Sequence, residues 1–310
     1  MAPPPLLAIV GATATGKSEL AVALAGAVDG EVVSADAYQV YRGLDIGTAK
    51  PSAEMRSRSP HHLIDILDPD EPLTLARYLD LAQAAVADIW SRCRLPILAG
   101  GSGQYVWAVL EGWQVPRVPP DRALRAELEA FAAEHGAEAL HRRLAEADPK
   151  GAARLDPNNV RRVVRALEVG TRTGLPLAAC QSRVPIAAEV LILGLRCSRD
   201  DLHCRIDARV EQMYATGLVE EVGRLRAAGY GEAAPVRGGI GYKEASAYLD
   251  CALTLAEAIE RTKTGTHRLV RKQAAWFKAG DARIRWVELR SNTFEKCLDI
   301  ARNWLAVLAG

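Results

Sequence analysis

The sequence predicts an α/β protein whose parallel sheet is flanked by helices and interrupted by an all-helical insertion. Two observations support this fold class. Short apolar runs alternate with helical patterns in the N-terminal part and return near the C-terminus. Between them, the segment Pro-Arg-Val-Pro-Pro at residues 116–120 is followed by helical patterns without a convincing strand. One sheet is therefore expected to receive strands from both sides of the insertion.

The N-terminal part of the core alternates strand and helix patterns. Residues 6–10 form an apolar run that stops at Gly11, which is typical of a buried parallel strand. Residues 17–28 follow with leucine or valine at four-residue spacing, as expected for one face of a helix. Further strands are predicted at residues 31–34, 62–66 and 96–99, and a further helix at residues 74–93. This alternation is typical of a parallel sheet with helices on both faces.

The domain boundaries follow from the proline-rich break. Asp121 is placed to cap the first helix of the insertion. Strand patterns resume at residues 190–195 and occur again at residues 284–289. The predicted domains are an α/β core of residues 1–115 and 189–310 and a helical insertion of residues 116–188.

The composition excludes several classes of protein. The 310 residues carry a formal net charge of +1, so a nucleic-acid partner needs a local basic patch. The six cysteines show neither a C-x-x-C pair nor zinc-ligand spacing, which favours free thiols in a reducing compartment. The sequence has no apolar run long enough to span a membrane and no charged secretory leader. We therefore expect a cytoplasmic monomer with no membrane and no obligate protein partner.

Residues 11–18, Gly-Ala-Thr-Ala-Thr-Gly-Lys-Ser, match the P-loop pattern G-x-x-x-x-G-K-[ST] between a predicted strand and a predicted helix. The glycines allow backbone N–H groups to point inward at phosphate oxygens, and the helix N-terminus adds its dipole. Lys17 supplies a full charge, and the Ser18 hydroxyl is placed to ligate Mg²⁺. We expect a P-loop NTPase-like core that binds a di- or triphosphate. The predicted phosphate contacts are Gly11, Ala12, Thr13, Ala14, Thr15, Gly16, Lys17 and Ser18.

Two polar residues follow other predicted strands of the core. Asp36 comes just after the strand at residues 31–34, facing the crevice where open α/β sheets bind ligands. A carboxylate there can be a metal ligand, a general base or a helix cap. Ser102 follows two glycines after the strand at residues 96–99, where it is either close to a ligand or the N-cap of a helix.

Two segments concentrate positive charge. Arg161, Arg162, Arg165 and Arg172 surround a single acid, Glu168, and residues 261–285 contain eight Lys and Arg against one Asp. A solvated helix face usually alternates charge signs, whereas one-signed segments fit a polyanion. Trp276 and Phe277, inside the second segment, either stack on a base or pack in the core.

These segments together resemble one known family, the tRNA dimethylallyltransferases, or isopentenyl-tRNA transferases, of bacteria. The similarity runs in order from about residue 8 to residue 276, and Asp-Ile-Gly-Thr-Ala-Lys-Pro at residues 45–51 is especially specific. The other matching segments are residues 11–18, 34–51, 60–65, 100–102, 165–169 and 239–243.

The resemblance implies transfer of a dimethylallyl group from dimethylallyl diphosphate to N6 of adenosine 37, beside the anticodon of tRNA. It implies that the P-loop holds the donor's diphosphate and not a nucleotide. It assigns Asp36 as the general base for the adenine amine and Ser102 as a hydroxyl that helps to place the amine. Arg209 matches an active-site arginine that meets the diphosphate.

The resemblance also implies tRNA contacts on both predicted domains. They are Asp36, Ala37, Tyr38, Gln39, Ser102, Arg161, Arg162, Arg165, Gly238, Gly239, Ile240, Gly241, Tyr242, Lys243, Arg271, Lys272, Gln273, Trp276 and Lys278. The chain departs from the family pattern in two places. Ser102 stands where threonine is common, and Thr266-His267-Arg268 replaces Thr-Arg-Gln, which moves one arginine by a position.

Three other functions fit parts of the pattern. A small-molecule kinase would use the P-loop for ATP and Ser102 at an acceptor site. An adenylate isopentenyltransferase would prenylate free AMP and would have little use for one-signed basic segments. An RNA-binding module would use the P-loop only to anchor a backbone phosphate.

Overall fold

The computed structural model describes residues 3–309, which form two compact units. One unit contains Met1–Leu110 and Ala187–Gly310, and the other contains Glu111–Ile186. The smaller unit therefore begins at Glu111, whereas the sequence predicted that it begins at residue 116. It falls earlier because β5 (Trp113–Gln114) pairs with β6 (Ser182–Arg183) as a short antiparallel sheet inside the smaller unit. The insertion is thus helical apart from this two-stranded pair.

The larger unit is built on one sheet with the strand order β3-β2-β4-β1-β7-β8, and all of its pairings are parallel. The strands are β1 (Pro5–Gly11), β2 (Gly30–Ser34), β3 (His61–His62), β4 (Leu95–Ala99), β7 (Glu189–Arg196) and β8 (Ile284–Glu288). Strands from both sides of the insertion share this sheet, as predicted. The central strand β1 lies between β4 and β7, with Leu7 level with Ile97 and Leu191.

One strand prediction was wrong. The strand expected at residues 62–66 ends after His62. Leu63 and Asp65 have φ angles of 64° and 56°, in the left-handed region that extended chains do not use. The apolar pattern continues because Leu63, Ile64 and Leu67 are buried as parts of a loop. Hydrophobicity alone does not separate a buried loop from a buried strand.

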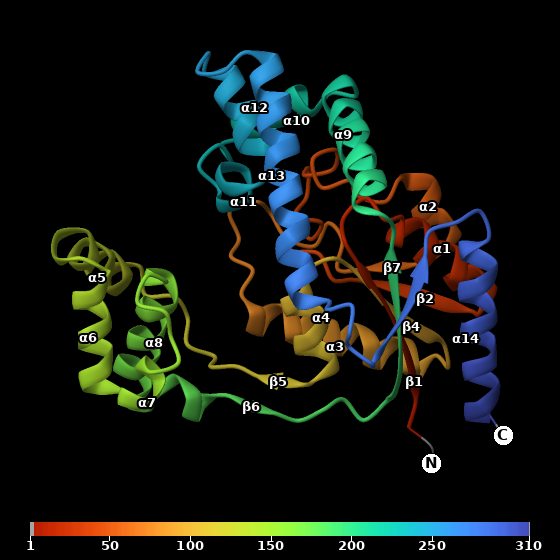
Figure 1. The fold of residues 1–310 in the computed structure, drawn as a ribbon, viewed down its shortest axis with the longest axis horizontal. Coiled ribbons are helices and arrows are strands. Elements are labelled where there is room, and N and C mark those ends of the chain that lie inside the picture. Colours follow the sequence, from red (N-terminus) through yellow and green to blue (C-terminus); the bar gives the residue numbers. More distant parts are fainter. Residues whose placement is uncertain (1–2, 310) are drawn as a thin grey trace. The chain divides into compact units, whose positions relative to one another are not determined.

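Helices cover both faces of the sheet (Figure 1). On one face, alternate residues of β1, β4 and β7 pack against α1 (Lys17–Ala27) and α14 (Thr293–Ala309). On the other face lie α3 (Leu75–Ser91) and α4 (Gly103–Leu110). The remaining helices of this unit are α2 (Ala53–Arg58), α9 (Arg199–Ala215), α10 (Leu218–Ala227), α11 (Ala234–Gly238), α12 (Tyr242–Leu249) and α13 (Leu255–Trp276). None of the helices in the described chain is long and apolar enough to cross a membrane.

The smaller unit packs its helices around a core of its own. These helices are α5 (Arg122–His135), α6 (Ala137–Ala147), α7 (Pro149–Ala152) and α8 (Val160–Thr173), followed by a short 3₁₀ turn, Leu177–Cys180. Asp121 caps α5 through its carboxylate, as the sequence predicted. Glu168, fully buried on α8, accepts hydrogen bonds from the guanidinium groups of Arg125 and Arg165.

Glu31 is the most heavily paired carboxylate of the sheet. Its side chain is 1% exposed and bonds to Arg92, to Arg94 at 3.2 Å and to His62 at 2.7 Å. These partners, the Arg92 hydrogen bond foremost, lower the pKa of Glu31 to about 2. Because the carboxylate is favoured in the folded state, its contribution to stability is complete above pH 4.5, its ordinary pKa, and is lost as the pH falls toward 2.

We expect Glu31→Gln to lower the free energy of unfolding by about 2 kcal/mol at pH 7, because charge-assisted hydrogen bonds are replaced by neutral ones. Urea unfolding of both proteins at pH 7 and pH 3 measures this difference. The difference should shrink at pH 3, because Glu31 is then largely protonated in the unfolded wild type and must lose that proton on folding. An equal difference at both values would show that the Glu31 charge does not stabilise the fold.

Candidate active site

The phosphate loop connects the end of β1 to the start of α1. Its backbone is held in a tight curl by left-handed conformations at Ala14 and Gly16, with φ angles of 64° and 81°. The Thr15 hydroxyl, which is buried, donates to the Ala12 carbonyl at 2.8 Å and closes the curl from inside. A Cβ at Gly11 would lie 2.6 Å from the backbone of β7, so glycine is required where the loop begins.

Lys17 lies at the base of this loop, where its Nζ donates to the Ala12 carbonyl at 2.6 Å. Burial, and then the positive charge of Arg209, lower the pKa of Lys17 to about 8, while Asp36 and Glu19 oppose the shift. Burial also lowers the pKa of Arg209. The free energy cost of keeping two neighbouring cations charged here falls when an anion binds between them. The charges of this pair therefore suit an anion, and more so an anion with more than one negative charge.

A small cavity of about 60 Å³ brings the predicted site residues together. It is lined by Thr13, Lys17, Ser18, Asp36, Gln39, Thr48, Ala49, Ala99, Gly100, Gly101, Arg209 and Gln273. Most of these residues follow the carboxyl ends of β1, β2 and β4, which meet at one edge of the parallel sheet. Thr48 and Ala49 come from the loop before α2, Arg209 from α9 and Gln273 from α13. Ser102 is not among the lining residues. It stands at the start of α4, where its carbonyl accepts from the backbone of Tyr105 and Val106.

Asp36 is fixed within this cavity by its own turn. Its Oδ1 accepts from the backbone N–H groups of Tyr38 at 2.8 Å and Gln39 at 3.2 Å. The second carboxylate oxygen, Oδ2, has no hydrogen-bond partner among the described residues. One oxygen thus sets the orientation of the carboxylate, and the other can take a proton from a ligand.

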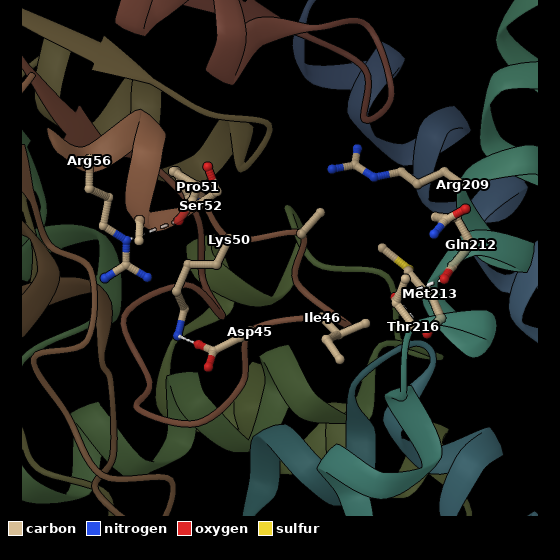
Figure 2. Close-up of a pocket in the computed structure, with 12 residues that line it drawn as sticks. Asp45, Ile46, Lys50, Pro51, Ser52, Arg56, Arg209, Gln212, Met213 and Thr216 are labelled. Carbon is tan, nitrogen blue, oxygen red and sulfur yellow. Dashed lines mark hydrogen bonds and ion pairs between the residues drawn. The ribbon is translucent and has the colours of Figure 1, made fainter. Parts of the chain in front are cut away.

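A larger cavity of about 460 Å³ adjoins the small one, and Ala49 and Arg209 line both. Figure 2 shows its two walls, residues 45–56 on one side and residues of α9 on the other. The α9 wall consists of Arg209, Gln212, Met213 and Thr216. Arg209 therefore stands where the two cavities meet.

Two buried polar groups, whose roles were not predicted from the sequence, bond to the wall formed by residues 45–50. The Glu221 carboxylate, 2% exposed, accepts from the backbone N–H groups of Asp45 at 3.1 Å and Ile46 at 2.8 Å. The Lys50 ammonium, 1% exposed, pairs with Asp45 and Asp65. The specific Asp-Ile-Gly-Thr-Ala-Lys-Pro stretch is thus a rigid loop that shapes the cavity. No local pattern marks Glu221, because its partners are far away in the sequence.

The predicted tRNA contacts divide into exposed and buried side chains. Exposed cations are Arg161 and Arg162 in the smaller unit and Lys243, Arg271, Lys272 and Lys278 in the larger one. Trp276 is 38% exposed, whereas Phe277 is buried and packs near Trp107. Of the two alternatives given for Phe277, stacking on a base or packing in the core, the structure confirms packing in the core.

Three of the other predicted contacts have side chains turned inward. Tyr242 is 1% exposed and donates to Glu221 at 2.7 Å. Arg165 pairs with Glu168 and donates to the Val118 carbonyl at 3.1 Å. Gln273 is buried among backbone groups. These side chains make hydrogen bonds within the protein, and of the three only Gln273 lines the small cavity.

Comparison with known proteins gives one consistent match. The model of a family described as IPP transferase matches residues 39–280, and a second model, described as isopentenyl transferase, matches residues 4–66. A tRNA dimethylallyltransferase of Roseiflexus is 50% identical over 97% of this chain and 99% of its own length.

Solved structures agree with these matches. The tRNA isopentenylpyrophosphate transferase of Bacillus halodurans is 42% identical, with a TM-score of 0.71 over 98% of this chain and 96% of that one. A eukaryotic dimethylallyltransferase described as acting on tRNA is 26% identical, with a TM-score of 0.83 over 98% of this chain and 80% of that one.

Proposed function

Because the chain belongs to the IPP transferase family, we propose that it transfers a dimethylallyl group from dimethylallyl diphosphate to N6 of adenosine 37 in the tRNA anticodon loop. The observation that carries this proposal is the meeting of an anion site, Lys17 and Arg209, with the oriented carboxylate of Asp36 at one small cavity. A kinase can use the same two groups, so the family match decides between the two activities.

The reaction exchanges one bond for another at the first carbon of the dimethylallyl group. The bond from this carbon to the bridging diphosphate oxygen breaks, and a bond to N6 of adenine forms. The electron pair of the broken bond leaves with the diphosphate. Lys17, Arg209 and the N–H groups of the phosphate loop are placed to stabilise the negative charge that gathers on that oxygen.

The amine must also lose a proton, because its lone pair forms the new bond. Asp36 Oδ2 is the acceptor in this proposal, while Oδ1 stays bonded to the turn. Adenosine 37 has to leave the stacked anticodon loop for N6 to reach this oxygen. An allylic cation must be kept from water, and we propose that the flipped adenine itself closes the site.

We propose Mg²⁺ as the metal that accompanies the diphosphate. Among the described residues there is no cluster of three or more His, Cys, Asp or Glu side chains that could hold a metal by themselves. The fit is instead through Ser18, which lines the cavity beside Lys17 and offers one hydroxyl. Such a site suits Mg²⁺, which keeps several waters and binds jointly with phosphate oxygens. When bound, the ion would neutralise charge on the leaving diphosphate.

We further propose that the protein acts as a cytoplasmic monomer. The free cysteines among the described residues, Cys93, Cys180, Cys197, Cys204, Cys251 and Cys297, support a reducing compartment.

Label transfer from the donor tests the proposed activity. The chain is incubated with donor labelled in the dimethylallyl group and with one of three acceptors: unmodified tRNA, AMP or no acceptor. We expect label in tRNA only. Label in AMP alone would make the protein an adenylate isopentenyltransferase. A separate incubation uses ATP labelled in its γ-phosphate and small-molecule acceptors. Transfer of that phosphate to an acceptor, without dimethylallyl transfer, would make the protein a kinase.

The exposed arginines of α8 give a separate test of tRNA binding. We expect Arg162→Ala to weaken tRNA binding and to lower the slope of log affinity against log salt by about one unit, because one phosphate contact is lost. Arg142→Ala, which removes an exposed arginine of the same unit outside the predicted contacts, is the control. Filter binding between low and moderate salt measures both, and an unchanged slope in the Arg162 variant removes this contact from the proposal.

A further inference from the structure

The buried side chain of Gln273 ties helix α13 to both loops of the active site. Its Oε1 accepts from the backbone N–H of Thr13 in the phosphate loop at 2.9 Å. Its Nε2 donates to the Gly101 carbonyl, which follows β4, at 3.1 Å. Gln273 is 8% exposed and lines the small cavity. One amide thus joins three segments that are far apart in the sequence.

Two glycines keep the space that this junction needs. A Cβ at Gly101 would lie 2.3 Å from Gln273 Nε2, and a Cβ at Gly103 would lie 2.3 Å from Trp276 on the same helix. The Trp107 indole donates to the Trp276 carbonyl at 3.1 Å. The C-terminal end of α13 is therefore fixed against the residues that follow β4 at several points.

Exposed cations lie next to Gln273 at the C-terminal end of α13. Arg271 and Lys272 immediately precede Gln273 and are exposed, as is Lys278 just beyond the helix. A polyanion bound to Arg271 and Lys272 would contact α13 directly beside Gln273. The Gln273 side chain in turn bonds to the phosphate loop. A shift of that side chain changes whether the Thr13 N–H is engaged by the amide.

We propose that Gln273 is a positioning residue that couples occupancy of α13 by tRNA to the affinity of the phosphate loop for diphosphate. This inference rests on the proposed function. The coupling must be reciprocal, because both ligands act on the same hydrogen bonds. From two hydrogen bonds we expect a coupling factor of about tenfold.

The test measures the binding of inorganic diphosphate with Mg²⁺ by calorimetry, with and without an anticodon stem-loop RNA. The coupling factor is the ratio of the two affinities. Gln273→Met removes both hydrogen bonds at similar volume, and Gln273→Glu keeps the acceptor for Thr13 but loses the donor to Gly101. Gln83→Met, which replaces an exposed glutamine of α3 outside the predicted tRNA contacts and both cavities, is the matched control.

We expect about tenfold coupling in the wild type and in Gln83→Met. Coupling should fall to about one in Gln273→Met and to an intermediate value in Gln273→Glu. A merely structural role would lower affinities or melting temperature without moving this ratio. If Gln273→Met does not fold, the coupling factor of Gln273→Glu alone tests the proposal: a value below that of the wild type supports it, and an unchanged value overturns it.

Coupling that is absent in the wild type, or unchanged in both Gln273 variants, would overturn the inference. Diphosphate and RNA binding can be measured without prenyl transfer. A wild type that shows coupling but transfers no prenyl group would therefore reject the proposed function and leave this inference standing.

Discussion

Replacing Asp36 with asparagine is expected to lower the rate of prenyl transfer by a factor of about 10² to 10⁴, the usual contribution of a general base. Asparagine keeps an oxygen that can accept from the N–H groups of Tyr38 and Gln39, so the turn is preserved. What is lost is the proton acceptor at the second position of the side chain. Single-turnover transfer to saturating tRNA measures this effect on the chemical step.

Asp36→Ala provides the comparison that separates the turn from the base. It removes both oxygens and should be at least as slow as Asp36→Asn. Both variants should bind tRNA within a few fold of the wild type, since one neutral or missing side chain does not change the exposed cations. Full activity in Asp36→Asn would show that another group takes the proton.

Replacing Lys17 with methionine is expected to lower kcat/KM for the donor by about 10² to 10³, because one preorganised donor to the leaving group is removed. Methionine preserves most of the volume beneath the phosphate loop. The KM for tRNA should change little, since Lys17 lies at the cavity and not among the exposed cations. Steady-state kinetics with each substrate varied in turn give both values.

Arg199→Met is the control for a lost positive charge. Arg199 is exposed at the start of α9, the helix that also carries Arg209. We expect its kcat/KM for the donor to remain close to that of the wild type. Equal losses in the Lys17 and Arg199 variants would mean that the long-range field, and not a local contact, attracts the diphosphate.

The parts of the site that sequence reasoning located are those with a local signal. The phosphate loop has a fixed spacing of glycines, Lys17 and Ser18, and Asp36 follows an apolar strand. Parallel strands bring their carboxyl ends to one edge, so these residues meet without any long-range information. Arg209 was found only through the family resemblance, because a single arginine on a helix carries no signal of its own.

The parts that were missed depend on contacts between distant segments. Glu221 was not predicted, and Gln273 was predicted only as a tRNA contact. Both side chains bond to backbone groups that lie far from them in the sequence. Arg165 was taken for a surface cation, although Glu168 stands three residues later on the same helix face. Glu168 was recognised as the single acid of this segment, but its ion pair with Arg165 was not predicted from the spacing.

The most direct test of the account is mass analysis of the nucleosides from unmodified tRNA after incubation with the protein, dimethylallyl diphosphate and Mg²⁺. The account predicts one new nucleoside, adenosine enlarged by a C₅H₈ unit, which is absent when adenosine 37 is replaced by guanosine. Unchanged nucleosides, or the same product from the guanosine variant, would contradict it.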